Sequence, residues 1–74
     1  MDALTHLVFD YFMFTVNPTL IGLRFHLLRC EEGDYKEPEL MRSLNLAKEV
    51  FELREEYEIC AIIHQILQNE IRSI

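Results

Sequence analysis

The chain has 74 residues, which is enough for one domain at most and lets folding bury only roughly 60% of the unfolded surface. Half of its residues are hydrophobic, and 13 acidic residues against 7 basic ones give a formal net charge of -6. This charge argues against direct binding of DNA or RNA, because such affinity depends on Lys and Arg side chains that displace counterions from the phosphates. The apolar content instead predicts that the domain is completed by a second copy or by another protein.

The cysteine count and the apolar stretches predict the compartment. Cys30 and Cys60 are too few for the disulfide framework of a small secreted domain, and no Lys or Arg precedes Arg24, so the charged start of a secretory signal is missing. The longest apolar stretch, 7–16, contains Asp10 and is about half as long as a bilayer span. We therefore expect a cytoplasmic protein with reduced thiols and no membrane association.

A first helix is predicted over residues 3–16, with Asp2 as its N-cap. Its apolar residues recur with the spacing of one helical stripe, formed by Leu4, Leu7, Val8, Tyr11 and Phe12. The alternative is a strand, because β-branched and aromatic residues dominate 8–16. The helix is favoured, since the chain has no second strand candidate to pair with this one.

A second helix is predicted over 18–32. Asn17 is a favoured N-cap, Pro18 is favoured at the first helical position, and Gly33 is placed to act as the C-cap. The apolar seam of this helix consists of Leu20, Leu23, Leu27 and Cys30. Three further residues widen the apolar face, namely Ile21, Phe25 and Leu28.

Pro38 begins a third helix, whose apolar stripe is Leu40, Leu44, Ala47 and Phe51. Charged residues interrupt the stripe over 54–58, and it resumes in a new phase with Ile59, Ile62, Ile63, Ile66, Leu67 and Ile71. Either one helix of about 36 residues continues to the end, or a turn near Arg54 to Tyr57 makes a hairpin of helices at about 38–54 and 57–73. The hairpin is favoured, because one helix would be roughly 54 Å long, too long for a compact domain of this mass.

The hairpin segment weakly resembles a tetratricopeptide hairpin. The signature spacing of that family is met by Leu44, Ala47, Lys48, Phe51, Cys60 and His64. Lys48 stands where the family has Gly, and Arg72 stands where it has Pro. The resemblance implies that the two helices pack closely at Ala47 and Cys60.

These elements predict a single all-α domain over 1–74, a small antiparallel bundle of three or four helices that is completed by dimerisation. The first helix is the expected interface, because it has apolar side chains on more than one face, and aromatic residues and Met are enriched in interface cores. The residues expected there are Phe9, Phe12, Met13, Phe14 and Val16. The alternative is that the other helices cover the first helix completely.

Two Cys and His pairs have the i, i+4 spacing of one helix face and are the candidates for a zinc site: His26 with Cys30, and Cys60 with His64. Core packing is the favoured interpretation of the cysteines, because Cys is among the most often buried residues. Catalysis is not expected. The two serines, Ser43 and Ser73, lie beside charged or polar helix positions, and no Gly-rich phosphate loop is present. We therefore expect no enzyme activity, no metal and no cofactor.

Acidic residues gather in two places. Glu31 and Glu32 fall in the last turn of the second helix, where the helix dipole disfavours anions, so solubility or a partner is their expected role. The second group is a candidate patch for a basic partner, with a solvated helix face as the alternative: Glu49, Glu52, Glu55, Glu56 and Glu58.

The function expected from the sequence is that of a non-enzymatic adaptor, chaperone or regulator that acts by protein–protein interaction. The alternative is an acidic inhibitor that occupies the basic nucleic-acid-binding site of a host enzyme or transcription factor. The two differ in salt dependence, because affinity that comes from charge falls steeply with ionic strength whereas apolar contact does not.

Overall fold

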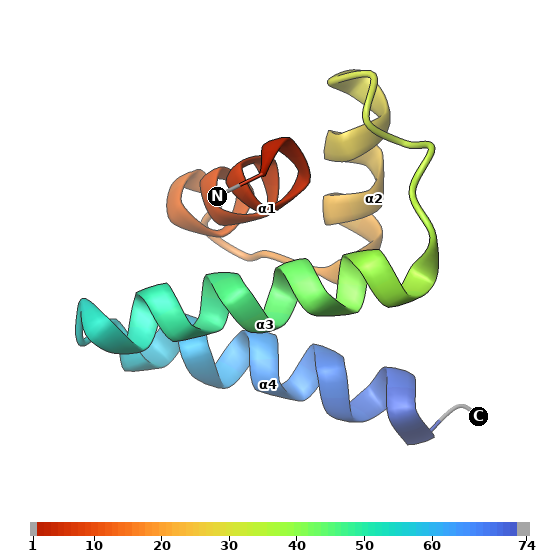
Figure 1. The fold of residues 1–74 in the computed structure, drawn as a ribbon. Coiled ribbons are helices and arrows are strands. Elements are labelled where there is room, and N and C mark those ends of the chain that lie inside the picture. The colour runs from red at the N-terminus through yellow and green to blue at the C-terminus, as the bar shows by residue number, and fades with distance from the viewer. Residues whose placement is uncertain (1, 73–74) are drawn as a thin grey trace.

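The computed structural model describes residues 2–72, and all regular structure in this range is helical. Four helices follow one another along the chain: α1 (Ala3–Phe14), α2 (Leu20–Arg29), α3 (Glu37–Leu53) and α4 (Tyr57–Arg72). α3 and α4 form an antiparallel hairpin, and α1 and α2 lie on one side of it (Figure 1). The all-α fold class is therefore confirmed, and the strand alternative for the first segment is wrong.

The hairpin has its turn where the charged run interrupts the apolar stripe. α3 ends at Leu53 and α4 begins at Tyr57, and the largest extent of the molecule is 31 Å, so one helix of roughly 54 Å is excluded. The N–H of Glu55 donates to the carbonyl of Glu52 at 3.0 Å, and the N–H of Glu56 donates to that of Phe51 at 2.9 Å. These two bonds form a Schellman motif, which places Glu55 in the left-handed region at φ 60°.

Replacing Glu55 by glycine is expected to stabilise the protein. A side chain in the left-handed region costs about 1 kcal/mol, and glycine avoids that cost. Chemical denaturation of Glu55→Gly should therefore give a free energy of unfolding about 1 kcal/mol above that of the unmodified protein. Gln65→Gly, at an exposed position inside α4, is the matched control and should lose about the same amount. A loss of stability in Glu55→Gly would contradict the strained turn.

The start of α2 differs from the prediction. The helix begins at Leu20 rather than Pro18, and the N-cap is Thr19 rather than Asn17, with the Thr19 hydroxyl accepting from the N–H of Gly22 at 3.0 Å. The reason is a contact with α1, because the Thr19 N–H donates to the hydroxyl of Tyr11 at 3.1 Å. A Cβ on Gly22 would lie 2.2 Å from the same hydroxyl, so glycine is required for this approach.

The end of α2 also differs. The helix ends at Arg29 with Cys30 as its C-cap, three residues before the predicted end, and Gly33 is not the cap. A second Schellman motif closes it, with Glu31 in the left-handed region at φ 59°. Gly33 instead leaves room for Leu28, whose Cδ1 lies 2.5 Å from where a Cβ of residue 33 would be.

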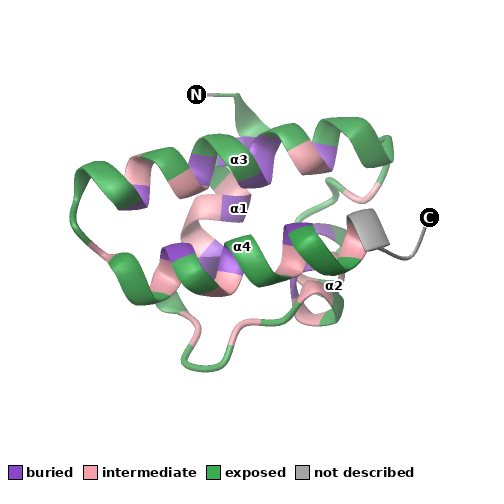
Figure 2. Cartoon of the chain, turned by 90° about the horizontal axis from the view of Figure 1, so that it is seen from below, coloured by how far each residue is buried: buried purple, intermediate pink, exposed green. Residues whose placement is uncertain are grey.

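All four helices contribute to the core, and buried and exposed positions alternate around each of them (Figure 2). The predicted stripe of the third helix is fully buried, as are Leu23 and Leu27 of the second. Cys30 was predicted to belong to the buried seam, and this is wrong, because α2 ends at Arg29 and Cys30 is exposed. α1 ends at Phe14, two residues earlier than predicted, and the predicted last residue of the fourth helix, 73, lies outside the described residues. The core consists of Val8, Tyr11, Phe12, Leu23, Leu27, Leu40, Leu44, Ala47, Phe51, Cys60, Ile63 and Leu67.

Candidate protein-binding surface

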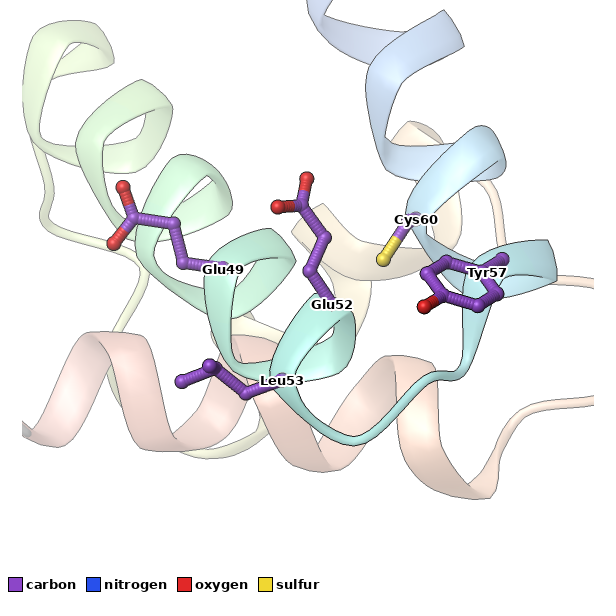
Figure 3. A pocket seen from close by; sticks show the side chains of 5 residues that line it. All are labelled: Glu49, Glu52, Leu53, Tyr57 and Cys60. Carbon is purple, nitrogen blue, oxygen red and sulfur yellow. The ribbon is translucent and has the colours of Figure 1, made fainter.

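A hollow of about 770 Å³ lies where α3 ends and α4 begins. The side chains of Glu49, Glu52 and Leu53 from α3, and of Tyr57 and Cys60 from α4, line it. Figure 3 shows the two glutamates projecting from α3 and Tyr57 lying beside Cys60. The hollow therefore combines carboxylates with apolar and aromatic surface.

Two large apolar side chains of this hollow are left in solvent. Leu53 is 85% exposed and Tyr57 is 65% exposed. Leu53 is the last residue of α3 and Tyr57 the first of α4, so these two exposed side chains flank the turn. Exposed aromatic and aliphatic side chains next to charged ones are typical of surfaces that bind proteins.

Four of the five predicted acidic residues extend this surface. Glu49, Glu52, Glu55 and Glu58 are exposed, and no ion pair within 4 Å joins any of them to a basic side chain among residues 2–70. We call these four glutamates, with Leu53 and Tyr57, the hairpin-end surface.

Glu56, the fifth predicted acid, has a different role. Its Oε2 is buried and lies 3.6 Å from Nε of Arg54, whose guanidinium stacks over the ring of Phe9 at 5.5 Å. Arg54 thus links the turn to α1, and its charge is offset by Glu56. Glu56 lies beside Glu55 and Glu58, but it differs from the other predicted acids because its carboxylate is paired with Arg54.

Cys60 is the reactive residue type in the hollow, but its surroundings keep the thiol protonated. Its Sγ donates to the carbonyl of Lys48 at 3.5 Å, which places α3 and α4 in close contact beside the buried Ala47, as the resemblance to a tetratricopeptide hairpin implies. Burial raises the pKa of the Cys60 thiol, and the carboxylate of Glu52 adds to this rise. A raised pKa lowers the thiolate fraction at neutral pH, so the geometry argues against a nucleophilic role.

The candidate zinc ligands do not form a site. Within residues 2–72, no group of three or more His, Cys, Asp and Glu side chains is placed to hold a metal ion. Cys30 is exposed at the end of α2, where its Sγ lies 4.0 Å from Nε2 of His26, whereas Cys60 is buried between α3 and α4. Of the two serines, Ser43 is buried and its hydroxyl accepts a hydrogen bond from the hydroxyl of Thr5, and Ser73 lies outside the described residues.

The structure does not bring the predicted interface residues of the first helix together. Phe12 is 1% exposed and belongs to the core, so its assignment to an interface is wrong. Phe9 is partly buried and stacks on Phe51 at 4.6 Å, and Met13 is partly buried as well. Phe14 and Val16 are exposed, at and beyond the end of α1. The reason is that α1 packs against both α3 and α2 and uses more than one face for this packing.

The exposed apolar face of α2 was not predicted as a binding surface. Ile21, Phe25 and Leu28 were predicted to widen the apolar face of this helix, and all three are exposed. A wide apolar face on a helix of ten residues was a usable signal, because the few neighbours available in a chain this short cannot cover it.

Comparison with known proteins gives no indication of function. No family model, no curated protein and no solved structure matches this chain. Across the described part of the chain, none of the helices has the length and apolar character needed to cross a membrane.

Proposed function

We propose that this chain is a non-enzymatic protein that acts by binding another protein at the hairpin-end surface. The observation that carries the proposal is that Leu53 and Tyr57 remain exposed within a hollow that also holds Glu49 and Glu52. The partner is a segment that combines Lys or Arg with apolar residues, because such a segment fills the hollow and meets the carboxylates at once.

The division of labour within the surface follows from physical chemistry. Contact with Leu53 and Tyr57 supplies affinity, because each removes apolar area from water on binding. The glutamates supply association rate and selectivity for a basic segment, since exposed charges steer encounters more than they hold complexes together. A raised pKa of Cys60 agrees with a role for the thiol in packing rather than in chemistry.

Affinity capture from the source cell with matched variants tests this proposal. The unmodified protein is expected to retain a protein that is lost with Leu53→Asp and with Tyr57→Asp, because each change removes an apolar contact and puts a carboxylate where the apolar residues of the partner would be buried. Phe14→Asp is the matched control, since Phe14 is equally exposed but lies on α1, and it should retain the partner. Identical capture by all four proteins would contradict the proposed surface.

An acidic inhibitor of a nucleic-acid-binding protein is the second candidate, and the four exposed glutamates favour it. Its partner would be a basic groove, and binding would depend on the carboxylates alone. Salt separates the two candidates: a partner held by Leu53 and Tyr57 stays bound in about 1 M salt, where the Debye length is about 3 Å, whereas a partner held by charge is released. In the second case Glu49→Gln with Glu52→Gln would abolish capture and Leu53→Asp would not.

A further inference from the structure

The outer face of α2 is apolar and open to solvent. Ile21, Phe25 and Leu28 have the i, i+4, i+7 spacing of one stripe and are 70%, 58% and 64% exposed. Together with Arg24 they line a hollow of about 210 Å³. The opposite face of the same helix buries Leu23 and Leu27. A helix that is apolar on two faces is typical of one covered on both sides.

Arg24 does not place a free charge on this face. Its Nη1 donates to Oε1 of Glu37 at 2.6 Å and to the hydroxyl of Tyr35 at 3.0 Å, and its Nη2 donates to Oε2 of Glu37 at 3.3 Å. The hydrogen bonds with Glu37 raise the pKa of Arg24 above its ordinary value. The guanidinium is thus held by the start of α3, and the aliphatic part of the side chain remains to line the hollow.

We propose that this face binds the same face of a second copy of the chain, with the two α2 helices antiparallel. A two-fold axis near Arg24 and Phe25 places Ile21 of each copy opposite Leu28 of the other, because these two residues are equally distant from that point. The two Phe25 rings then meet close to the axis. The stripe is therefore self-complementary, as an isologous interface requires, and antiparallel helices also oppose their dipoles favourably.

The distribution of charge makes α2 the helix at which a second copy can approach most easily. Two chains that each carry a net charge of -6 repel one another, so the contact should form where acidic side chains are fewest. Of the four helices described, α2 is the one without Asp or Glu, and it carries Arg24 and Arg29. Approach through α2 keeps the acidic hairpin end away from the contact, because α2 lies at the opposite end of α3 (Figure 1).

The same register gives a role to the two glutamates that follow α2. Glu31 and Glu32 are exposed and lie beyond the C-terminal end of their own helix, where its dipole disfavours them. In an antiparallel pair, the C-terminal end of one α2 lies beside the N-terminal end of the other, so these two glutamates come close to that end of the second copy. Carboxylates are favoured there, because the first N–H groups of a helix carry partial positive charge.

The area of the apolar stripe on α2 indicates how stable the proposed dimer is. Three partly exposed side chains contribute less than the roughly 800 Å² per partner of a standard stable interface. We therefore expect a dimer that dissociates in the micromolar range rather than a permanent one.

Measuring the mass against concentration tests the dimer. Light scattering of the unmodified protein should give about twice 8.9 kDa at high concentration and fall toward 8.9 kDa on dilution. Phe25→Glu and Ile21→Glu should each weaken the dimer at least about tenfold, with unchanged helical circular dichroism as the check on folding. Phe14→Glu, on α1, is the control and should leave it intact. A mass near 8.9 kDa at every concentration up to hundreds of micromolar, or a dimer lost only in Phe14→Glu, would overturn the proposal.

Disulfide cross-linking tests the register. In a Cys30→Ser and Cys60→Ser background, Ile21→Cys mixed with Leu28→Cys should form a mixed disulfide, because antiparallel pairing brings these positions together. Ile21→Cys alone should not cross-link. A homogeneous Ile21→Cys disulfide, or none in the mixture, would overturn the antiparallel arrangement. The hairpin-end variants Leu53→Asp and Tyr57→Asp should leave dimer mass and cross-linking unchanged, so this proposal and the proposed function fail separately.

Discussion

Phe12→Ala is expected to lower the free energy of unfolding by about 3–5 kcal/mol. Phe12 is 1% exposed, and its ring makes an edge contact with Tyr11 at a centroid distance of 5.3 Å. Truncation removes the buried ring and leaves a cavity in the core, and both effects destabilise the fold. A chain of this length has a total stability on the order of 4–11 kcal/mol, so the variant loses at least about a quarter of that stability and unfolds if the stability is at the low end of the range. Urea denaturation followed by circular dichroism measures the change.

The matched control for this variant lies two residues further along the same helix. Phe14 is 82% exposed, so Phe14→Ala should change the free energy of unfolding by less than about 0.5 kcal/mol. A loss of several kcal/mol in both variants would show that Phe14 is covered in solution by something other than this chain's own helices. A small loss in both variants would show that Phe12 is not in the core.

The helices with one narrow apolar stripe are those that the sequence predicts best. In the third helix, the four stripe residues from Leu40 to Phe51 are buried as expected, and the loss of phase at Arg54 marks the turn. The bounds of α2 could not be predicted from local patterns. They depend on the bond from Thr19 to Tyr11, which joins two helices, and on Glu31 adopting a conformation that usually favours glycine.

The candidate site was predicted in part. The acidic residues of the hairpin end were found from the sequence, because a charged run that interrupts an apolar stripe is visible in it. Exposure of Leu53 and Tyr57, and of the outer face of α2, was not found. Apolar residues look alike in a sequence whether they are buried or not, and only the number of neighbouring helices decides which are covered.

A buried hydrogen bond between α1 and α3 was also invisible in the sequence. The Thr5 hydroxyl donates to the Ser43 hydroxyl at 2.9 Å, and both residues are essentially without solvent contact. These positions are 38 residues apart in the chain, so no local pattern connects them. The bond fixes the position of α1 along α3, because a sliding movement would leave two buried hydroxyls without partners.

Removing either hydroxyl alone is expected to lower the free energy of unfolding by more than half of the loss caused by removing both. Thr5→Val and Ser43→Ala should each lower the free energy of unfolding by about 1–3 kcal/mol, because each leaves a buried hydroxyl unpaired. The double variant should lose less than the sum, with a coupling energy of at least about 0.5 kcal/mol, since no unpaired hydroxyl remains. Denaturant unfolding of the four proteins closes the cycle. Thr5→Ser is the control that keeps the hydroxyl and removes only a methyl group, so it should retain the coupling with Ser43. Additive losses within about 0.3 kcal/mol would show that the two hydroxyls do not stabilise one another and that α1 is positioned by apolar packing alone.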